Sequence, residues 1–239
     1  MAIEQLVLLP GLLCDDAVWT EQRAALAPQA ESFVADFNDL DSIKGMAEKV
    51  LDTAPYKVFS LAGHSMGGRV AMEVVRLAPQ RVRRLALLDT GFEPRVAGQA
   101  AQAERDKRMA LLAVAQKQGM RAMGKLWAPG MVHPDHLATP LFDVILDMIE
   151  RRTPKQFEAQ ITALLARPDA TPVLQSLACP TVFICGRQDL WSPLSRHEAM
   201  LKLAPPQVGE LHAIEDCGHM STMEKPQAVS GILAKWLAT

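Results

Sequence analysis

A serine inside a glycine-rich segment is the residue of this chain best placed to do covalent chemistry. The sequence Gly63-His64-Ser65-Met66-Gly67-Gly68 follows a short apolar run and precedes apolar residues at helical spacing. A serine at such an abrupt strand-to-helix turn is forced into unfavourable backbone dihedrals, so the residues two before and two after it must lack a Cβ atom. Its Oγ then stands clear of the sheet, in front of a helix N-terminus. The pattern predicts that Ser65 is a nucleophile; the alternative is a glycine-rich turn with an idle serine.

A serine nucleophile needs a base, and the base needs a carboxylate that orients it. Both are expected just beyond strand ends and downstream of Ser65, in the order serine, acid, histidine. His219 meets this condition, because it lies between the last predicted strand and the last predicted helix, directly after Gly218. The side chain of His64 is expected to diverge from that of its neighbour Ser65. The other histidines fall in a helix, in a strand or in a helical insertion, where a metal pair is not expected (His197, His212, His133 and His136).

Two aspartates lie where the orienting carboxylate is expected. Asp189 follows the predicted strand 181–185, within the sequence Gly186-Arg187-Gln188-Asp189. Asp89 ends the preceding strand, from which a carboxylate also reaches the imidazole. A strand-end aspartate commonly binds local backbone groups instead. We therefore expect Asp189 to be the acid and keep Asp89 as its rival.

Acyl transfer through a serine also needs two preorganised N–H groups that bind the oxyanion of the tetrahedral intermediate. Met66, directly after the serine at the start of a helix, is expected to supply one of them. The second is expected from the loop after the first strand, most simply from Leu12 next to Gly11, or from Leu13 if the loop is bulged. If neither N–H donates to the oxyanion, the segment Pro10-Gly11-Leu12-Leu13 is only a turn.

A regular alternation of strands and helices must position these residues. Apolar runs predict buried strands at residues 5–9, 32–36, 58–62, 82–88, 181–185 and 210–215. Helices are predicted at residues 17–27, 42–54, 193–203 and 226–237, and directly after Ser65. Continuously apolar strands that alternate with helices indicate an α/β fold, with a mostly parallel sheet of about six strands covered on both faces. Functional residues then gather beyond the carboxyl ends of the strands.

A stretch without convincing strands interrupts this alternation. Helical windows at residues 98–118, 120–127, 134–151 and 154–167 are separated by turn residues. We expect a core domain of residues 1–94 and 178–239 and a helical cap of residues 95–177 that roofs the carboxyl edge of the sheet. Most of its apolar side chains are expected to pack the cap onto the core. The candidates for substrate contact are Trp127 in the cap, Trp191 beside Asp189, and Arg69 after the elbow glycines.

Composition argues against several classes of function. The chain has 239 residues, 49% of them hydrophobic, which is enough to bury a large core. A net charge of −2 and a pI near 6.3 leave no basic footprint for nucleic acid. Four cysteines without C-x-x-C spacing favour free thiols and a cytoplasmic location. The apolar run 6–13 is short and interrupted by Pro10-Gly11, so neither a signal peptide nor a membrane anchor is expected.

The elbow motif, Gly186-Arg187-Gln188-Asp189 and Gly218-His219 together resemble the α/β-hydrolase superfamily over nearly the whole chain. Two features depart from it: Pro10-Gly11 stands where family members usually carry His-Gly, and the antiparallel hairpin common at their N-terminus is not evident. The resemblance implies that His219 takes the proton of Ser65, Ser65 attacks an acyl carbonyl, and water releases the acid, while Asp189 stabilises the imidazolium. It implies no metal ion and no organic cofactor.

Three functions fit these residues. The first is a serine hydrolase that cleaves carboxylic esters, thioesters or lactones of small to medium acyl groups. The second keeps the same three residues but acts on a carbon–carbon bond or eliminates, as relatives in aromatic degradation and menaquinone synthesis do. Arg69 after Gly68 is a hint toward an anionic substrate; the alternative is that it faces solvent on the first turn of its helix. The third is a hydrolase-fold ligand receptor or signalling protein with slow turnover. A small molecule is the expected partner, and no feature of the sequence indicates an oligomeric state.

Overall fold

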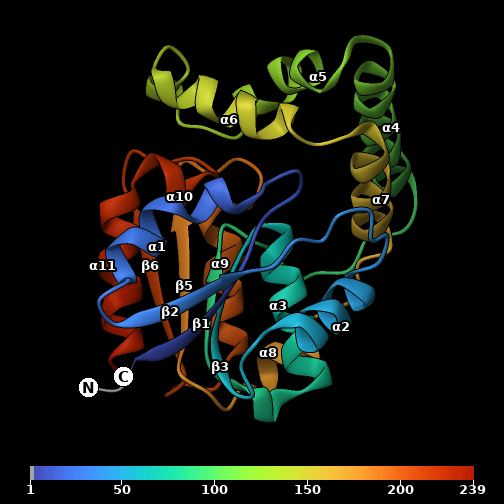
Figure 1. Cartoon of the computed structure of the whole chain (residues 1–239). Helices are drawn as coiled ribbons and strands as arrows, with labels where there is room; N and C mark the ends of the chain where they lie inside the picture. The colour runs from blue at the N-terminus through green and yellow to red at the C-terminus, as the bar shows by residue number, and fades with distance from the viewer. Residues whose placement is uncertain (1–2) are drawn as a thin grey trace.

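Six apolar segments form one sheet in which every neighbouring pair of strands is parallel. The computed structural model describes residues 3–239 (Figure 1). The strands are β1 (Glu4–Leu9), β2 (Ala30–Val34), β3 (Phe59–His64), β4 (Val82–Leu88), β5 (Thr181–Gly186) and β6 (Gly209–Ile214), in the spatial order β2-β1-β3-β4-β5-β6. The predicted α/β fold with six parallel strands is confirmed.

The order of the strands reverses between β1 and β3, and this reversal places two loops side by side. The chain leaves β1 toward β2 on one side of the sheet, whereas β3 continues toward β4 on the other. The loops that follow β1 and β3 therefore diverge from adjacent strand ends, and ligands of open parallel sheets bind in such crevices. These are the loops that carry Leu12 and Ser65.

Helices cover both faces of the sheet (Figure 1). On one face α1 (Thr20–Leu26) packs against α11 (Pro226–Leu237). On the other face lie α2 (Ile43–Thr53), α3 (Met66–Leu77) and α9 (Leu194–Leu203). The core between the layers is built from the strand side chains, of which Phe59, Leu61, Leu85 and Phe183 are almost completely buried.

Four helices between β4 and β5 form an arch over the carboxyl end of the sheet (Figure 1). They are α4 (Gln99–Gln118), α5 (Met120–Trp127), α6 (Pro140–Glu150) and α7 (Pro154–Leu165), with α4 packed against α5 and α7, and α5 against α6. A further helix, α8 (Thr171–Gln175), contacts α3 and α9 below the arch. The arch occupies the place expected for the cap, while the boundaries of the cap at residues 95 and 177 stay a prediction.

The segment 134–151 is not the single helix that its pattern predicts. A short 3-10 helix, η4 (Pro134–His136), is followed by a break before α6 begins at Pro140. Thr139 is extended, with φ −111° and ψ 161°, because a residue before proline is pushed out of the helical region. Similarly, the predicted helix 17–27 begins as a 3-10 helix, η1 (Asp16–Trp19), capped by Asp15, which accepts the Ala17 N–H.

Two short helices carry no periodicity that would reveal them in the sequence. They are α8 and α10 (Ser221–Glu224), and each spans little more than one turn.

Within residues 3–239, no helix combines the length and the hydrophobicity needed to cross a membrane.

Replacing Gly67 by alanine tests the packing on which the fold depends. An added Cβ would lie 2.2 Å from the Leu9 carbonyl oxygen, so strand and helix would have to separate. We expect the free energy of unfolding, measured by urea titration, to fall by about 3 kcal/mol. The matched control is Gly231→Ala in α11, where no atom lies within 4 Å; its stability should rise by about 0.5–1 kcal/mol. Equal stability of the two variants would contradict the prediction.

Candidate active site

Ser65 occupies a strained turn between β3 and α3. Its φ of 54° and ψ of −115° are unfavourable for a residue with a side chain. The Ser65 N–H donates to the Leu88 carbonyl at 2.8 Å, and the Thr90 hydroxyl donates to the Ser65 carbonyl at 2.6 Å. A Cβ on Gly63 would lie 2.3 Å from the Gly67 carbonyl oxygen. Glycine is therefore required here, as the sequence predicts, and the neighbouring strand β4 helps to hold the turn.

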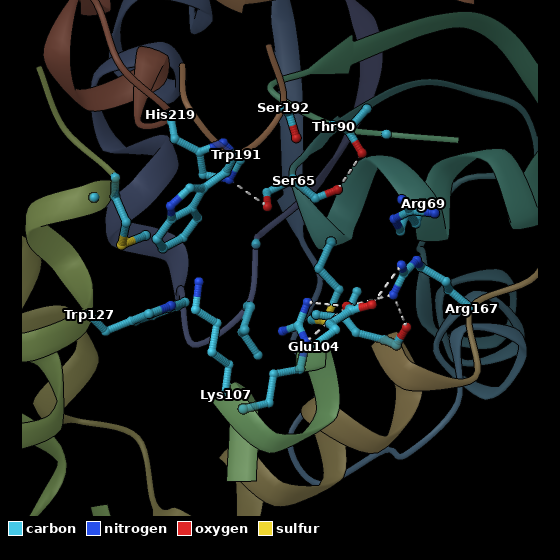
Figure 2. A pocket seen from close by; sticks show the side chains of 18 of the residues that line it. Ser65, Arg69, Thr90, Glu104, Lys107, Trp127, Arg167, Trp191, Ser192 and His219 are labelled. Carbon is cyan, nitrogen blue, oxygen red and sulfur yellow. Dashed lines mark hydrogen bonds and ion pairs between the residues drawn. The ribbon is translucent and has the colours of Figure 1, made fainter. Parts of the chain in front are cut away.

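Ser65, His219 and Asp189 form one continuous chain of hydrogen bonds. His219 Nε2 lies 2.8 Å from Ser65 Oγ, and His219 Nδ1 lies 2.7 Å from Asp189 Oδ2. The other carboxylate oxygen of Asp189 accepts the N–H groups of Trp191 and Ser192 at 2.8 and 2.9 Å. Figure 2 shows His219 above Ser65, next to the ring of Trp191. This arrangement allows the imidazole to take the hydroxyl proton while the carboxylate holds Nδ1 protonated.

The charges of protonated His219 and ionised Asp189 stabilise each other. Burial opposes protonation of His219, but the facing Asp189 carboxylate outweighs it and holds the pKa of the imidazole above its ordinary value. Burial also opposes ionisation of Asp189, yet His219 and the two backbone N–H groups hold the pKa of that carboxyl below its ordinary value. His219 can therefore accept a proton, and Asp189 can stay ionised beside it.

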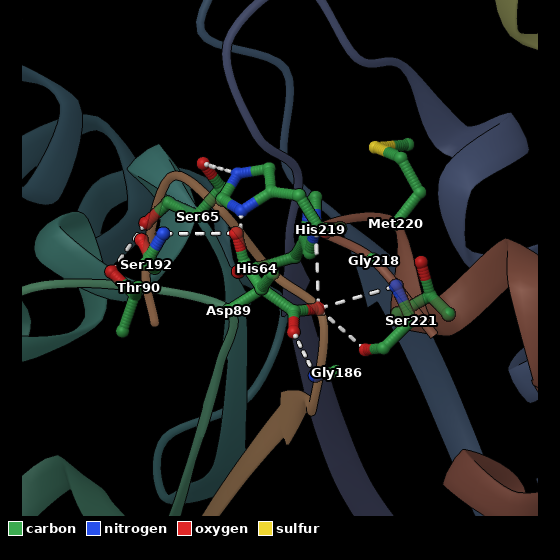
Figure 3. Close-up of polar contacts among 12 residues, drawn as sticks. His64, Ser65, Asp89, Thr90, Gly186, Ser192, Gly218, His219, Met220 and Ser221 are labelled. Carbon is green, nitrogen blue, oxygen red and sulfur yellow. Dashed lines mark hydrogen bonds and ion pairs between the residues drawn. The ribbon is translucent and has the colours of Figure 1, made fainter. Parts of the chain in front are cut away.

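Asp89, the rival acid, lies beneath the hydrogen-bonded residues Ser65, His219 and Asp189. It does not contact the ring nitrogens of His219. Its carboxylate accepts the Gly186 N–H at 3.0 Å and the N–H and hydroxyl of Ser221 (Figure 3). Complete burial, followed by the nearby charge of Asp189, raises the pKa of Asp89 well above its ordinary value. Asp89 thus ties the end of β4 to β5 and to the loop after β6.

His64 lies under His219 rather than beside the serine hydroxyl. Its Nε2–H donates to the His219 carbonyl at 2.8 Å, and the two rings are 5.5 Å apart (Figure 3). Burial and the proximity of His219 lower the pKa of His64 to about 3, so it stays neutral. Its Nδ1 points toward Gly11, where an added Cβ would come within 2.9 Å. His64 therefore fills the space between the His219 loop and the loop after β1.

The remaining histidines lie away from the serine hydroxyl. His197 is buried in α9 and accepts the Thr90 N–H at 3.2 Å. His212 pairs with Glu210 in β6. His133 and His136 lie at the cap edge, with rings 6.5 Å apart. Among residues 3–239, no group of three or more His, Cys, Asp or Glu side chains is arranged to hold a metal ion.

Met66 and Leu12, whose backbone N–H groups are the predicted oxyanion donors, both line the cavity next to Ser65. Neither N–H has a hydrogen-bond partner within residues 3–239. The Leu13 N–H, the alternative donor, is occupied, because it donates to the Gln160 side-chain oxygen at 2.9 Å. Gln160 comes from α7 and also donates to the Asn38 carbonyl at 3.1 Å. A buried cap residue thus holds the loop after β1 and leaves Leu12 available.

A cavity of about 980 Å³ opens above Ser65, between the core and the arch. Trp127, Trp191 and Arg69, the three predicted contact residues, all line it (Figure 2). The Trp191 ring centroid lies 5.1 Å from that of His219 and 5.2 Å from that of Trp127. The two tryptophans therefore form an aromatic wall that extends from His219 into the cap.

The lining of the cavity is also rich in positive charge. Five basic side chains line it against two acidic ones, namely Arg69, Lys107, Arg108, Arg167 and Arg196 against Glu93 and Glu104. Glu104 is bonded by Arg167 at 2.8 and 3.0 Å, and Glu93 pairs with Arg196 at 3.2 Å. Burial, with repulsion from Arg167 and Arg196, lowers the pKa of Arg69 to about 9. The cavity as a whole favours a ligand with negative charge.

Several residues of the site were not predicted from the sequence. Gln160, Arg167 and Lys107 belong to the cap, where only the fold shows which side of a helix faces the cavity. Glu224 accepts N–H groups from the His219 loop. Its place before Lys225-Pro226 is a weak signal, because it marks a helix start but not the direction of the side chain.

A family model of the alpha/beta hydrolase fold matches residues 19–226. The chain therefore belongs to the α/β-hydrolase family. Among solved structures it is similar to a thermophilic esterase from Thermogutta terrifontis, determined with malate bound. The TM-score is 0.88 at 25% identity, and the match covers 98% of this chain and 89% of the esterase.

Two curated relatives have names that describe reactions other than ester hydrolysis. A 2-hydroxy-6-oxononadienedioate/2-hydroxy-6-oxononatrienedioate hydrolase from a Pseudomonas species is 26% identical, over 80% of this chain and 67% of the relative. A 2-succinyl-6-hydroxy-2,4-cyclohexadiene-1-carboxylate synthase from Serratia proteamaculans is 26% identical, over 97% of this chain and 92% of the relative. The chain spans about two thirds of the length of the first curated relatives that it matches. The family model establishes the family, and the names of these relatives describe more than one reaction.

Replacing Asp189 by asparagine should reverse the direction in which the pKa of His219 is shifted. With the facing charge removed, burial dominates, so the pKa should fall from above 6.5, the ordinary histidine value, to below it. NMR titration of the His219 ring protons measures this directly. Asp216→Asn on the same loop is the control, because Asp216 is exposed and asparagine tolerates its φ of 50°. A His219 pKa that stays raised without Asp189 would contradict the assigned contact.

Proposed function

We propose that the protein is a serine hydrolase that cleaves a carboxylic ester, thioester or lactone of a small to medium acyl substrate through an acyl-enzyme on Ser65. The observation that carries the proposal is the hydrogen-bonded chain from Ser65 Oγ through His219 to Asp189. Its distances are those needed for a base within reach of the proton that it takes.

The first half-reaction forms the acyl-enzyme. Ser65 Oγ attacks the substrate carbonyl carbon while its proton moves to His219 Nε2. The electron pair of the carbonyl moves to its oxygen, and the N–H groups of Leu12 and Met66 bind that oxyanion. When the tetrahedral intermediate collapses, the bond to the leaving group breaks and His219 returns the proton to it. Asp189 stabilises the imidazolium in both steps.

The second half-reaction releases the acid. A water molecule takes the place of the leaving group and gives a proton to His219 Nε2 as its oxygen attacks the acyl carbon. The second tetrahedral intermediate collapses, the bond to Ser65 Oγ breaks, and His219 returns the proton to the serine. All groups required for this cycle belong to the chain, and water is the only further reactant.

The excess of basic side chains in the cavity lining favours a substrate that carries a carboxylate. Arg69 lies on the first turn of α3, only four residues beyond Ser65, and lines the cavity together with Arg167 and Lys107 (Figure 2). An anion there is held while its acyl group lies at Ser65, with Trp191 and Trp127 against the apolar part of the substrate. The carboxylates in the names of the two curated relatives, and the malate of the esterase, support this reading.

A second candidate is hydrolysis of a carbon–carbon bond next to a ketone in a carboxylated diketone. Arg69 and the names of the curated relatives favour it over the third candidate, a receptor with slow turnover. In this reaction the bond that breaks joins the acyl carbon to a carbon leaving group, and that carbon must receive the proton. The same Ser65, His219 and oxyanion donors serve both reactions, so kinetics must distinguish them.

A pre-steady-state burst experiment tests the acyl-enzyme. With p-nitrophenyl acetate and butyrate, we expect a burst of p-nitrophenol followed by fast turnover, and loss of both in Ser65→Ala and His219→Ala. Rate losses of about 10⁴-fold or more are expected for either variant. A burst with almost no turnover would favour the receptor. Failure of a serine-directed fluorophosphonate to label Ser65 would contradict the assignment of the nucleophile.

The variant Arg69→Ala tests the substrate and the second candidate. We expect activity on neutral p-nitrophenyl esters within about 3-fold of the parent, and a loss of about 100-fold in kcat/KM on a carboxylated substrate, because the buried charge-assisted contact to the anion disappears. Arg105→Ala, at an exposed position on α4, is the control. High activity of the parent on a carboxylated diketone, with little on its ester analogue, would favour carbon–carbon hydrolysis. Equal losses on neutral and anionic esters would contradict a role in charge recognition.

A further inference from the structure

The backbone of the loop that carries His219 is held at three consecutive N–H groups. The Gly218 N–H donates to the Glu224 carboxylate at 3.1 Å, and the Met220 N–H donates to it at 3.0 Å. Between them, the His219 N–H donates to the Met131 carbonyl at 2.6 Å. Figure 3 shows Gly218, His219 and Met220 next to one another, above Asp89. The N–H groups of Gly218, His219 and Met220 are thus all bonded, by one carboxylate and one carbonyl.

Glu224 connects this loop to the cap. Its side chain is completely buried at the end of α10, and its Oε2 also accepts the His133 N–H at 2.7 Å. The ring of His136 is the nearest basic group, with Nε2 at 3.9 Å. The carboxylate therefore accepts hydrogen bonds from the His219 loop and from the cap at the same time. Charge-assisted bonds of this kind are about twice as strong as neutral ones.

The cap segment of residues 131–133 lies directly on the His219 loop. An added Cβ on Gly218 would lie 2.7 Å from the His133 nitrogen and 2.8 Å from the Met131 oxygen. The same part of the cap borders the cavity, since Met131 and Gly130 line it and Gly130 packs against Trp191. The segment that is bonded to the His219 backbone is therefore also part of the cavity wall.

We propose that Glu224 and the cap segment 131–133 are a clamp that positions His219 for catalysis. The proposal rests on the proposed function, in which His219 is the base. His219 reaches Ser65 Oγ and Asp189 Oδ2 together, at 2.8 and 2.7 Å, only while its backbone stays in place. A misplacement of about 1 Å in a catalytic group can cost about 100-fold in rate. Glu224 is accordingly a positioning residue, and the cap joins substrate binding to the geometry of the base.

Glu224→Gln tests the carboxylate. The amide retains one oxygen but turns an NH₂ group toward N–H donors, so the three backbone bonds cannot all persist. We expect kcat on a p-nitrophenyl ester to fall about 100-fold with KM within about 3-fold. The downfield proton resonance of His219 Nδ1–H, which requires the short bond to Asp189, should weaken or disappear. Glu215→Gln, on the same loop but exposed and paired with Arg187, should change neither.

His133→Pro and His133→Ala test the cap arm. His133 has φ −60°, which proline adopts, so proline removes the N–H bond to Glu224 at a compatible backbone angle. Alanine removes the same side chain but keeps the N–H. We expect a decrease in kcat of about 10-fold for proline, about the size of one lost charge-assisted bond, and little change for alanine. Equal effects of the two substitutions would overturn the role of the cap.

Two further readouts separate this proposal from the proposed function and from misfolding. Failure of the parent protein to form an acyl-enzyme would contradict the proposed function, whereas the Nδ1–H resonance reports the clamp without turnover. If Glu224→Gln does not fold, the pair of His133 variants still decides, since neither removes a buried charge. A folded Glu224→Gln protein with unchanged kcat and an unchanged resonance would overturn the clamp.

Discussion

The site depends on how closely backbone segments approach one another at the carboxyl edge of the sheet. Gly67 lies against the Leu9 carbonyl, and a Cβ on Gly186 would lie 2.0 Å from the Gly218 carbonyl oxygen. The first contact joins the start of α3, directly after the serine, to the end of β1. The second joins the end of β5, which leads to Asp189, to the loop that carries His219. Any side chain at these points would move the reacting groups apart, because the atoms in contact belong to backbone that cannot turn away. The strained dihedrals of Ser65 persist because these contacts and the bonds to β4 over-determine them.

Buried charge beneath the site is arranged so that only one histidine can take up a proton. His219 faces Asp189 and has a raised pKa, whereas His64, 5.5 Å away, is held neutral by burial. Asp89, below both, accepts hydrogen bonds from Gly186 and Ser221, and its Oδ2 lies 3.6 Å from His64 Nε2 rather than beside a ring nitrogen of His219. The two aspartates have similar places at the ends of neighbouring strands. Their different partners result from the loop after β5, which turns the Asp189 carboxylate toward His219.

The arch of helices does more than cover the serine. Gln160 occupies the Leu13 N–H, which leaves Leu12 facing the cavity, and Met131 accepts the His219 N–H. The cap also brings Trp127, Lys107 and Arg167 to a cavity whose floor is the serine elbow. The core thus contributes Ser65, Asp189 and His219 together with Arg69 and Arg196, whereas the cap contributes Lys107, Arg108 and Arg167. The cap also makes two of the contacts that hold the loops around Ser65 and His219, through Gln160 and Met131.

The sequence by itself determined the fold class, the six parallel strands and the positions of the candidate residues along the chain. These properties are local: apolar runs, helical spacing and the glycines around Ser65 have their effect within a few residues of the chain. It could rank Asp189 above Asp89 but not exclude either, because both follow strands. Only the tertiary structure decided which carboxylate faces His219, that Leu13 is occupied, that Glu224 turns toward the histidine loop, and that the basic residues of α3, α4 and α7 meet in one cavity. The physical reason is that side-chain direction in the loops and cap depends on contacts between residues up to about 150 positions apart, such as Leu13 with Gln160, and no local pattern encodes them.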